Sequence, residues 1–214
     1  MASRILLADD HEIVRRGLRA ILAARPDWEI CAEASNGRQA LEQAKQLKPD
    51  LVIMDIGMPE MNGISATRQI LKELPTTEVL ILTIHDPEPL VRSVFDAGAH
   101  GFMLKSDAAR DLLTAVEALL KHQVSFSSRV SELMLQGYLK GPAPEANDGV
   151  RLTGREQEIV QLVAEGKSNK EVATALHIGV RTVETHRRHI MAKLNLHNVG
   201  ELVRYAVRTG MVEP

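Results

Sequence analysis

The sequence predicts two domains, an α/β domain built on a five-stranded parallel sheet and a small all-α domain that follows it. Up to about residue 121, short apolar strings alternate with segments whose apolar residues recur at helical spacing. After a stretch punctuated by glycine and proline, the remaining residues show helical spacing only. Alternating strand and helix patterns indicate parallel strands joined by right-handed helical crossovers, which place helices on both faces of the sheet.

The first domain is expected to contain five consecutive strand–helix units. The expected strands cover about 5–8, 29–33, 51–54, 79–82 and 101–104, and the helices that follow them cover about 13–22, 37–47, 64–74, 89–97 and 108–121. Prolines stand just after the first three helices, at Pro26, Pro49 and Pro75, where they end a helical pattern. We therefore place the first domain at 1–121.

A linker and a helical domain complete the chain. We assign 122–149 to the linker, with a candidate short helix within 126–139 and a flexible stretch from 138. The domain at 150–214 is expected to hold four helices, at about 155–165, 168–176, 180–194 and 198–209. A short helix, a three-residue turn and a longer helix form a helix-turn-helix arrangement at 168–194.

Composition narrows the class of protein. The 214 residues are 44% hydrophobic and 25% charged, which is ordinary for a globular protein. The single cysteine, Cys31, excludes an internal disulfide framework and a cysteine-based zinc site, and its apolar neighbours predict a buried thiol. Because neither a signal peptide nor an 18-residue apolar run is evident, we expect a cytoplasmic protein without a membrane anchor.

Charge is distributed unevenly along the chain. Residues 1–121 hold 14 Lys and Arg against 18 Asp and Glu, a net charge of −4. Residues 150–214 hold 10 against 7, a net charge of +3. The imbalance predicts metal or phosphoryl chemistry in the first domain and a polyanionic partner for the second.

Reactive side chains follow the strands of the predicted sheet. Asp9 and Asp10 follow the first strand, Asp55 the third, Thr83 the fourth and Lys105 the fifth. Carboxyl ends of parallel strands meet at one sheet edge, where ligands bind in open α/β sheets. Three adjacent carboxylates repel one another unless a cation neutralises them, and hard oxygen ligands select Mg²⁺ or a similar ion. The alternative is that these aspartates simply cap helices or loops, but two acids at one strand end exceed what one cap needs.

The long helix of the second domain has a polar outer stripe. Arg181, Glu184, Thr185 and Arg188 recur at helical spacing opposite the apolar positions Val183, Ile190, Met191 and Leu194. Such a stripe alone could be an ordinary solvated surface, but the helix-turn-helix pattern and the positive charge favour DNA contact. The candidates for phosphate contact are Lys170, Thr182, Arg187 and Lys193, and those for base contact are Glu184, Thr185 and Arg188.

With these residues in view, the chain resembles a DNA-binding response regulator of the NarL/FixJ family over nearly its whole length. The receiver motifs are Asp9-Asp10, residues 54–63 (Met-Asp-Ile-Gly-Met-Pro-Glu-Met-Asn-Gly), Leu82-Thr83 and residues 101–105 (Gly-Phe-Met-Leu-Lys). The motifs of a LuxR-type helix-turn-helix are 152–156 (Leu-Thr-Gly-Arg-Glu), 168–173 (Ser-Asn-Lys-Glu-Val-Ala) and 182–186 (Thr-Val-Glu-Thr-His). The resemblance implies a flavodoxin-like receiver with strand order 2-1-3-4-5.

The resemblance also implies roles for the residues at the strand ends. Asp55 would accept a phosphoryl group from a sensor histidine kinase. Asp10, Asp55 and the backbone carbonyl of Gly57 would bind Mg²⁺, with Asp9 acting through water. Lys105 would pair with the phosphoryl oxygens, Thr83 would donate to one of them, and Phe102 matches the aromatic switch position. Three positions depart from the usual pattern. Phe102 replaces the common Tyr, Ser106 follows Lys105 where many receivers have proline, and Gly179 stands where the recognition helix often has a Ser or Thr cap.

Two other functions compete with this interpretation. A phosphatase or mutase of the haloacid dehalogenase type also uses a strand-end aspartate, but it needs a second carboxylate two residues later, where this chain has Gly57. A regulator that binds DNA without phosphorylation is disfavoured because Asp9, Asp10, Asp55, Thr83 and Lys105 are all present. We expect no enzymatic activity beyond self-phosphorylation and self-dephosphorylation.

The last helix carries an apolar face that could serve two purposes. Val199, Leu202, Val203, Ala206 and Val207 recur at helical spacing within 198–209. All of them could face the small domain's own core. The resemblance instead implies pairing through this helix, so that phosphorylation shifts a mostly monomeric protein, whose receiver restrains the second domain, toward a homodimer that binds double-stranded DNA.

Overall fold

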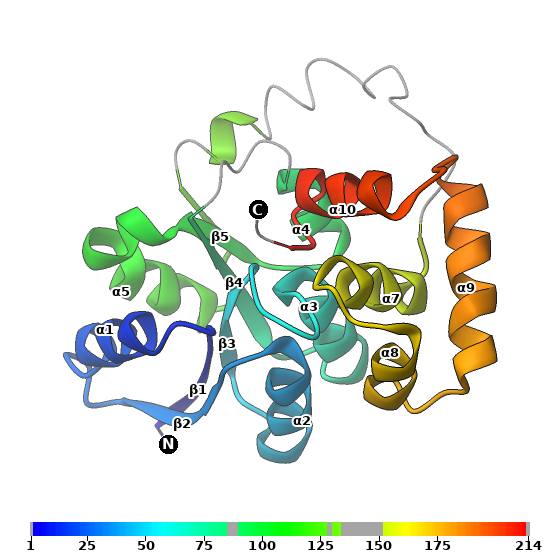
Figure 1. Cartoon of the computed structure of the whole chain (residues 1–214). Helices are drawn as coiled ribbons and strands as arrows, with labels where there is room; N and C mark the ends of the chain where they lie inside the picture. The colour runs from blue at the N-terminus through cyan, green and yellow to red at the C-terminus, as the bar shows by residue number, and fades with distance from the viewer. Residues whose placement is uncertain (1, 85–89, 128–129, 134–151, 213–214) are drawn as a thin grey trace. The chain divides into compact units, whose positions relative to one another are not determined.

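The computed structural model describes residues 2–84, 90–127, 130–133 and 152–212. It divides into two compact units, Met1–Gly141 and Pro142–Pro214. In the first unit, strands alternate with helices as the sequence predicts (Figure 1). Its elements are β1 (Ser3–Ala8), α1 (Glu12–Leu22), β2 (Trp28–Ala34), α2 (Gly37–Leu47), β3 (Leu51–Asp55), α3 (Gly63–Glu73), β4 (Glu78–Thr83), α4 (Val91–Asp96), β5 (Gly101–Leu104), η1 (Lys105–Asp107), α5 (Ala108–Leu119) and β6 (Ser125–Phe126).

The sheet contains one strand more than predicted. Its order is β2-β1-β3-β4-β5-β6, and every neighbouring pair is parallel. The first five strands confirm the predicted order. The sixth, β6, pairs with β5 in the register Phe102↔Phe126, so part of the predicted linker 122–149 belongs to the sheet. Two residues are too few to show an alternating pattern, so this strand could not be predicted from the sequence.

Two apolar cores pack against the two faces of the sheet. The side chains of β1, β3, β4 and β5 alternate between them, as expected for strands covered by helices on both faces. One core includes residues of α2, α3 and α4, and the other includes residues of α1 and α5. Phe102 is fully buried in the first core together with Val130, which lies in the helical residues 130–133. The rest of the candidate helix at 126–139 lies outside the described residues, apart from 126 and 127.

Cys31 corrects one prediction about the core. The register of β1 against β2 shifts between Ile5 and Leu6, so that Cys31 is passed over on β2. Its thiol lies 3.4 Å from the carbonyl oxygen of Ile5 and is half-buried rather than buried. Because β2 is the edge strand of the sheet, most of its residues are only partly buried, and apolar neighbours in the sequence do not reveal an edge position.

The second unit is helical. Its elements are α7 (Gly154–Ala164), α8 (Asn169–Ala175), α9 (Val180–Lys193) and α10 (Val199–Arg208), each within a residue or two of its expected bounds. Thr153 begins α7 and Ser168 begins α8, each in a reciprocal capping box with the glutamate three residues later. The four helices share an apolar core of their own, in which Val183 and Ile190 are buried and Met191 and Leu194 are partly buried. In the described part of the chain, no helix is long and apolar enough to cross a bilayer.

Candidate functional site

The carboxyl end of the sheet in the first unit gathers the predicted acidic residues. Ligand atoms of Asp9, Asp10, His11 and Asp55 all lie within 4.8 Å of one another. Asp9 and Asp55 are buried, whereas Asp10 and His11 are exposed. Carboxylates from two separate strand ends therefore converge on one point, as the topology of the parallel strands requires.

Lys105 lies between the two buried carboxylates. Its Nζ atom is 2.7 Å from Oδ2 of Asp9 and 2.8 Å from Oδ2 of Asp55. Thr83 ends β4 beside β3 and is also buried, so the structure places this hydroxyl at the same end of the sheet. One ammonium cannot balance three carboxylates, and the site keeps an excess of negative charge.

Burial and charge shift the pKa values of the central pair. The pKa of the Asp55 carboxyl is raised to about 6, because burial and, to a smaller extent, the nearby Asp9 raise it more than Lys105 lowers it. Burial lowers the pKa of the Lys105 ammonium, but the adjacent Asp55 and Asp9 outweigh this effect and leave that pKa raised. A donor set of carboxylate oxygens with uncompensated negative charge fits a hard divalent cation such as Mg²⁺.

The loop after β3 keeps Asp55 at the start of a tightly packed turn. Asn62 caps α3 by accepting a hydrogen bond from the backbone N–H of Ser65. A Cβ atom at Gly63 would stand 1.9 Å from the carbonyl oxygen of Asp55, so only glycine allows α3 to begin this close to the site. Gly57, the predicted carbonyl ligand, lies in this loop between Asp55 and α3.

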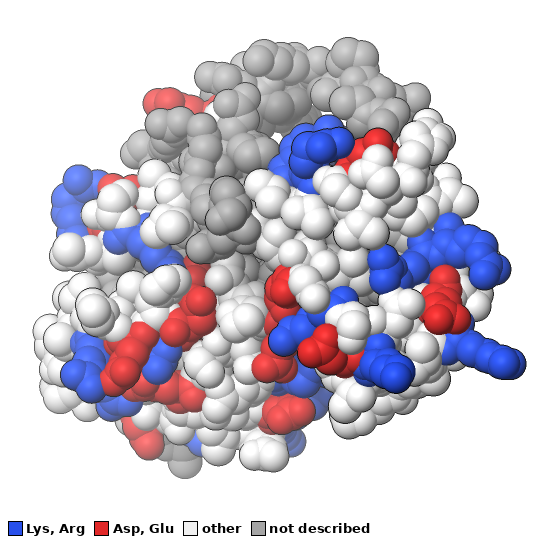
Figure 2. Space-filling model, in the orientation of Figure 1, with Lys and Arg blue, Asp and Glu red and all other residues white. Residues whose placement is uncertain are grey.

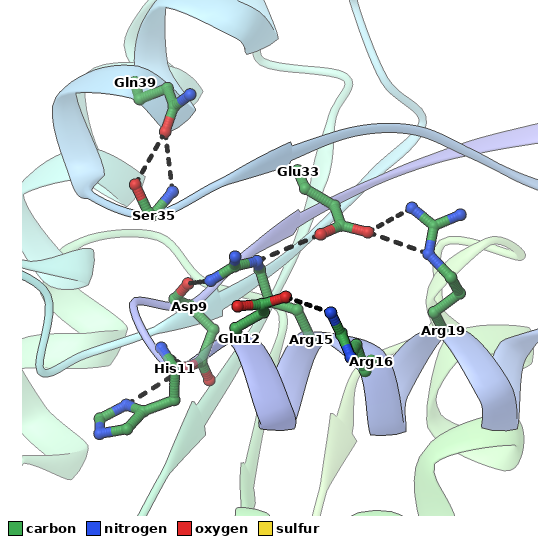
Figure 3. Close-up of polar contacts among 9 residues, drawn as sticks. All are labelled: Asp9, His11, Glu12, Arg15, Arg16, Arg19, Glu33, Ser35 and Gln39. Carbon is green, nitrogen blue, oxygen red and sulfur yellow. Dashed lines mark hydrogen bonds and ion pairs between the residues drawn. The ribbon is translucent and has the colours of Figure 1, made fainter.

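The structure adds three side chains around the acidic loop that the sequence does not predict there. His11 places Nδ1 2.7 Å from Oδ1 of Asp10, and its backbone N–H donates to Oδ1 of Asp9 at 2.8 Å. Arg15 reaches back from α1 to the loop, and Glu33 reaches over from β2 (Figure 3). The position of His11 beside Asp10 was visible in the sequence, but no sequence signal links Arg15 to Glu33.

The candidate DNA contacts lie on α8 and α9. Lys170, Thr182, Glu184, Thr185 and Arg188 are exposed, whereas Arg187 and Lys193 are half-buried. Figure 2 shows Lys and Arg side chains gathered over these two helices.

Both half-buried cations on α9 have partners within the domain. Arg187 donates to the side chain of Asn169, and Lys193 Nζ lies 2.8 Å from Oε2 of Glu156. These contacts give each cation a structural role beside the DNA contact that the sequence predicts for it.

The fold and the two sites define a class: a protein with a buried, metal-compatible aspartate on a flavodoxin-like sheet, joined to a helix-turn-helix domain. Residues 5–117 match the family of response regulator receiver domains, and residues 150–206 match the luxR family of bacterial regulatory proteins. The chain belongs to the NarL/FixJ family of response regulators.

Relatives of known name match along the whole chain. The transcriptional regulatory protein LiaR of Bacillus subtilis (strain 168) is 39% identical over 98% of this chain and 99% of its own length. The response regulator protein VraR of Staphylococcus aureus is 37% identical over 100% of both chains. A structure of RcsB from Salmonella enterica serovar Typhimurium aligns with a TM-score of 0.62 at 25% identity, covering 96% of this chain and 98% of that one.

Proposed function

We propose that the protein is a transcriptional regulator whose DNA binding depends on phosphorylation of Asp55 by a sensor histidine kinase. The observation that carries the proposal is the convergence of Asp9, Asp10, Asp55 and Lys105 at one sheet edge, in a chain that also holds a LuxR-type domain. Asp55 is buried and is the last residue of β3, the strand that lies between β1 and β4.

The chain's own residues would carry the transfer. An Asp55 carboxylate oxygen forms a bond to phosphorus while the bond from phosphorus to the kinase histidine nitrogen breaks, and that nitrogen keeps the electron pair. Asp10, Asp55 and the Gly57 carbonyl would hold Mg²⁺, which shields the approach of the anionic carboxylate to the anionic phosphoryl group. Lys105 can exchange its contact with Asp55 for one with a phosphoryl oxygen without moving to another part of the site.

Phosphorylation would then favour a DNA-competent dimer. The added charge of about −2 draws Thr83 and Lys105 toward the new oxygens. Phe102 lies on β5, the strand that Lys105 directly follows and that pairs with β4, which ends at Thr83. RcsB has been solved bound to promoter rprA in the presence of the phosphomimetic BeF₃⁻, and as two dimers bound to two parallel DNAs. We extend both properties, binding to double-stranded DNA and assembly as a homodimer, to this chain.

Phosphorylation with a small phosphodonor tests the proposal. The full-length protein should gain the mass of one phosphoryl group when incubated with acetyl phosphate and Mg²⁺. Asp55→Ala should abolish the gain, and Asp10→Ala should shift it to higher Mg²⁺ concentration because it removes a direct ligand. Asp27→Ala is the matched control, since Asp27 is an exposed aspartate just before β2. Unchanged labelling of Asp55→Ala would disprove the assignment, and unchanged DNA affinity after labelling would favour a phosphorylation-independent regulator.

A further inference from the structure

Arg15 joins the loop that carries Asp9 and Asp10 to the second strand of the sheet (Figure 3). One of its Nη atoms donates to the carbonyl oxygen of Asp9 at 2.6 Å, and its Nε donates to Oε2 of Glu33 at 3.2 Å. The Arg15 side chain is only 15% exposed. A largely buried guanidinium therefore bridges a backbone carbonyl at the metal-compatible site and a carboxylate on β2.

The contact with Asp9 restrains the residue that follows it. The Asp9 carbonyl belongs to the planar peptide unit between Asp9 and Asp10. A hydrogen bond to this carbonyl therefore fixes the orientation of the plane that contains the Cα atom of Asp10. α1 begins at Glu12 without a side-chain cap, because His11 at its N-cap makes no such hydrogen bond. The turn is instead held by the Asp9 carboxylate, which accepts from the His11 N–H, and by Arg15 from the next turn of the helix.

Glu33 anchors Arg15 in this position. Its other carboxylate oxygen, Oε1, accepts from Nε of Arg19 at 3.0 Å. The hydrogen bond from Arg19, together with that from Arg15, lowers the pKa of the Glu33 carboxyl, which keeps it ionised near neutral pH. Glu33 also pairs in register with Leu7 on β1, one strand position before the end at Ala8, so the anchor is built into the sheet beside the loop.

We propose that Arg15 is a positioning residue for the divalent cation of the phosphoacceptor site. Anchored by Glu33, Arg15 holds the Asp9–Asp10 peptide so that the Asp10 carboxylate stays directed at the cation. This inference rests on the proposed function, because it assumes that the site binds Mg²⁺. A purely electrostatic role would have the opposite sign: removal of a positive charge beside a cation site would tighten cation binding. The direction of the change therefore separates the two roles.

Arg16 provides a matched control. It is the same residue type at the next position of α1, but its side chain is 77% exposed and pairs with Glu12 on the same helix. It makes no described contact with the Asp9–Asp10 loop or with β2. Arg16→Gln therefore removes one positive charge from α1 without removing the bridge.

Calorimetric titration of metal-free full-length protein with Mg²⁺ tests the proposal. Arg15→Gln should weaken Mg²⁺ binding roughly tenfold, which is the smallest loss expected when a residue that orients a metal ligand is removed. Arg16→Gln should leave Mg²⁺ binding unchanged. Glu33→Gln should weaken binding in the same direction, and the double variant should be no weaker than the more affected single variant, because the two residues act as one unit. Arg15→Lys keeps the positive charge but cannot bridge both partners, so weaker Mg²⁺ binding by this variant keeps the test decisive if Arg15→Gln does not fold. Unchanged or tighter Mg²⁺ binding by folded Arg15→Gln, or by Glu33→Gln, would overturn the proposal.

Phosphorylation kinetics separate positioning from a general structural defect. With acetyl phosphate as donor, Arg15→Gln should need about tenfold more Mg²⁺ for its half-maximal rate yet reach the wild-type rate at saturating Mg²⁺, because Asp55, Lys105 and Thr83 are intact. A lower rate at saturating Mg²⁺ would show damage beyond positioning and contradict the proposal. If the wild-type protein bound no Mg²⁺, the proposed function would fail; if Asp10→Ala lost Mg²⁺ while Arg15→Gln kept it, only the role of Arg15 would fail.

Discussion

The Nζ atom of Lys105, the residue after β5, lies 2.8 Å from Oδ2 of Asp55, the last residue of β3, although β4 lies between these two strands in the sheet. The same ammonium is 2.7 Å from Oδ2 of Asp9, so a single cation serves two buried carboxylates. Asp55 consequently ionises with difficulty although it has a cationic partner. A charged Asp55 therefore lowers the stability of the folded receiver domain. A second cation at the site, or a phosphoryl group on Asp55, would change this effect.

The first prediction concerns this effect: without Mg²⁺ at pH 7, Asp55→Asn should be more stable than the wild type. The pKa of Asp55 is about 6 in the folded protein and 3.8 ordinarily, so between these values the folded state binds more protons than the unfolded state. Its contribution to stability therefore falls as the pH rises through about 4 to 6, and the loss is complete above 6. At about 1.4 kcal/mol per pKa unit, we expect a gain of about 1–3 kcal/mol at pH 7.

Urea unfolding at pH 7 and at pH 4 measures this effect. The difference between Asp55→Asn and the wild type should shrink toward zero at pH 4, where the folded protein already carries a protonated Asp55. Asp111→Asn is the control, because Arg110 lowers the pKa of that exposed carboxyl and its removal should not stabilise the protein. An equal gain at both pH values would contradict the prediction.

The receiver site could be predicted from the sequence to the extent that it follows from strand ends. Asp9, Asp10, Asp55 and Lys105 each come directly after an apolar string or at its end, and parallel strands must bring their carboxyl ends together. The bridge from Arg15 to Glu33 could not be predicted in this way. It depends on the rotation of α1 over the sheet and on the register of β1 against β2, and neither is encoded in a local pattern.

The starts of the helices in the second unit follow from short-range sequence patterns. The reciprocal capping boxes at Thr153 and Ser168 follow the pattern of a hydroxyl residue with a glutamate three positions later, which is visible in the sequence. The missing cap at Gly179, by contrast, is confirmed: Gly179 is the N-cap of α9 and supplies no side-chain acceptor.

The second prediction follows from that missing cap: Gly179→Ser should stabilise the helical domain by a few tenths of a kcal/mol. Gly179 has an extended backbone with φ −72° and ψ 146°, which any residue adopts. An added Cβ atom would meet the Thr182 hydroxyl oxygen at 3.5 Å, an ordinary contact, and the serine hydroxyl could accept from the first turn of α9. Thermal unfolding measures the change. Gly179→Ala is the control, because it adds the Cβ without the acceptor, and an equal gain from alanine would show that the hydroxyl does not cap the helix.

The third prediction separates two kinds of DNA contact. Arg188 is exposed on α9, on the stripe of Glu184 and Thr185, and Arg188→Ala should reduce the preference for the specific sequence by about 1–3 kcal/mol if the side chain reads a base edge. Lys170 is exposed on α8, and Lys170→Ala should weaken binding to all sequences about equally, with the salt dependence reduced by about one counterion.

Fluorescence titrations of specific and scrambled DNA at several salt concentrations distinguish these outcomes. Lys193→Ala is informative as a comparison, because its ammonium is already paired with Glu156. If Arg188→Ala and Lys170→Ala lower the affinity for both DNAs by the same factor, Arg188 contacts phosphate only and its assignment to base contact is wrong.

The fourth prediction concerns α10, whose apolar residues the structure divides into two groups. Leu202 and Ala206 are buried in the core of the helical domain, as the alternative interpretation of this helix requires. Val199 is 46% exposed and Val203 and Val207 are half-buried, and these three recur at intervals of four residues along one stripe. The helix can therefore fill its own core and still present an apolar stripe to a second copy of the chain.

We expect Val203→Glu to abolish pairing on DNA while leaving the domain folded, because a charge at the centre of the stripe would be buried without a partner in a dimer. Two-fold pairing places two recognition helices about 34 Å apart, which matches two inverted half-sites one DNA turn apart. Phosphorylated wild-type protein should sediment with such DNA as a 2:1 complex, whereas Val203→Glu should bind one copy at a time with the affinity of a single half-site. Val124→Glu is the control, since Val124 is an equally apolar residue that is 65% exposed in the receiver. Cooperative 2:1 binding by Val203→Glu would exclude α10 as the pairing helix and leave receiver-driven dimerisation as the simpler mechanism.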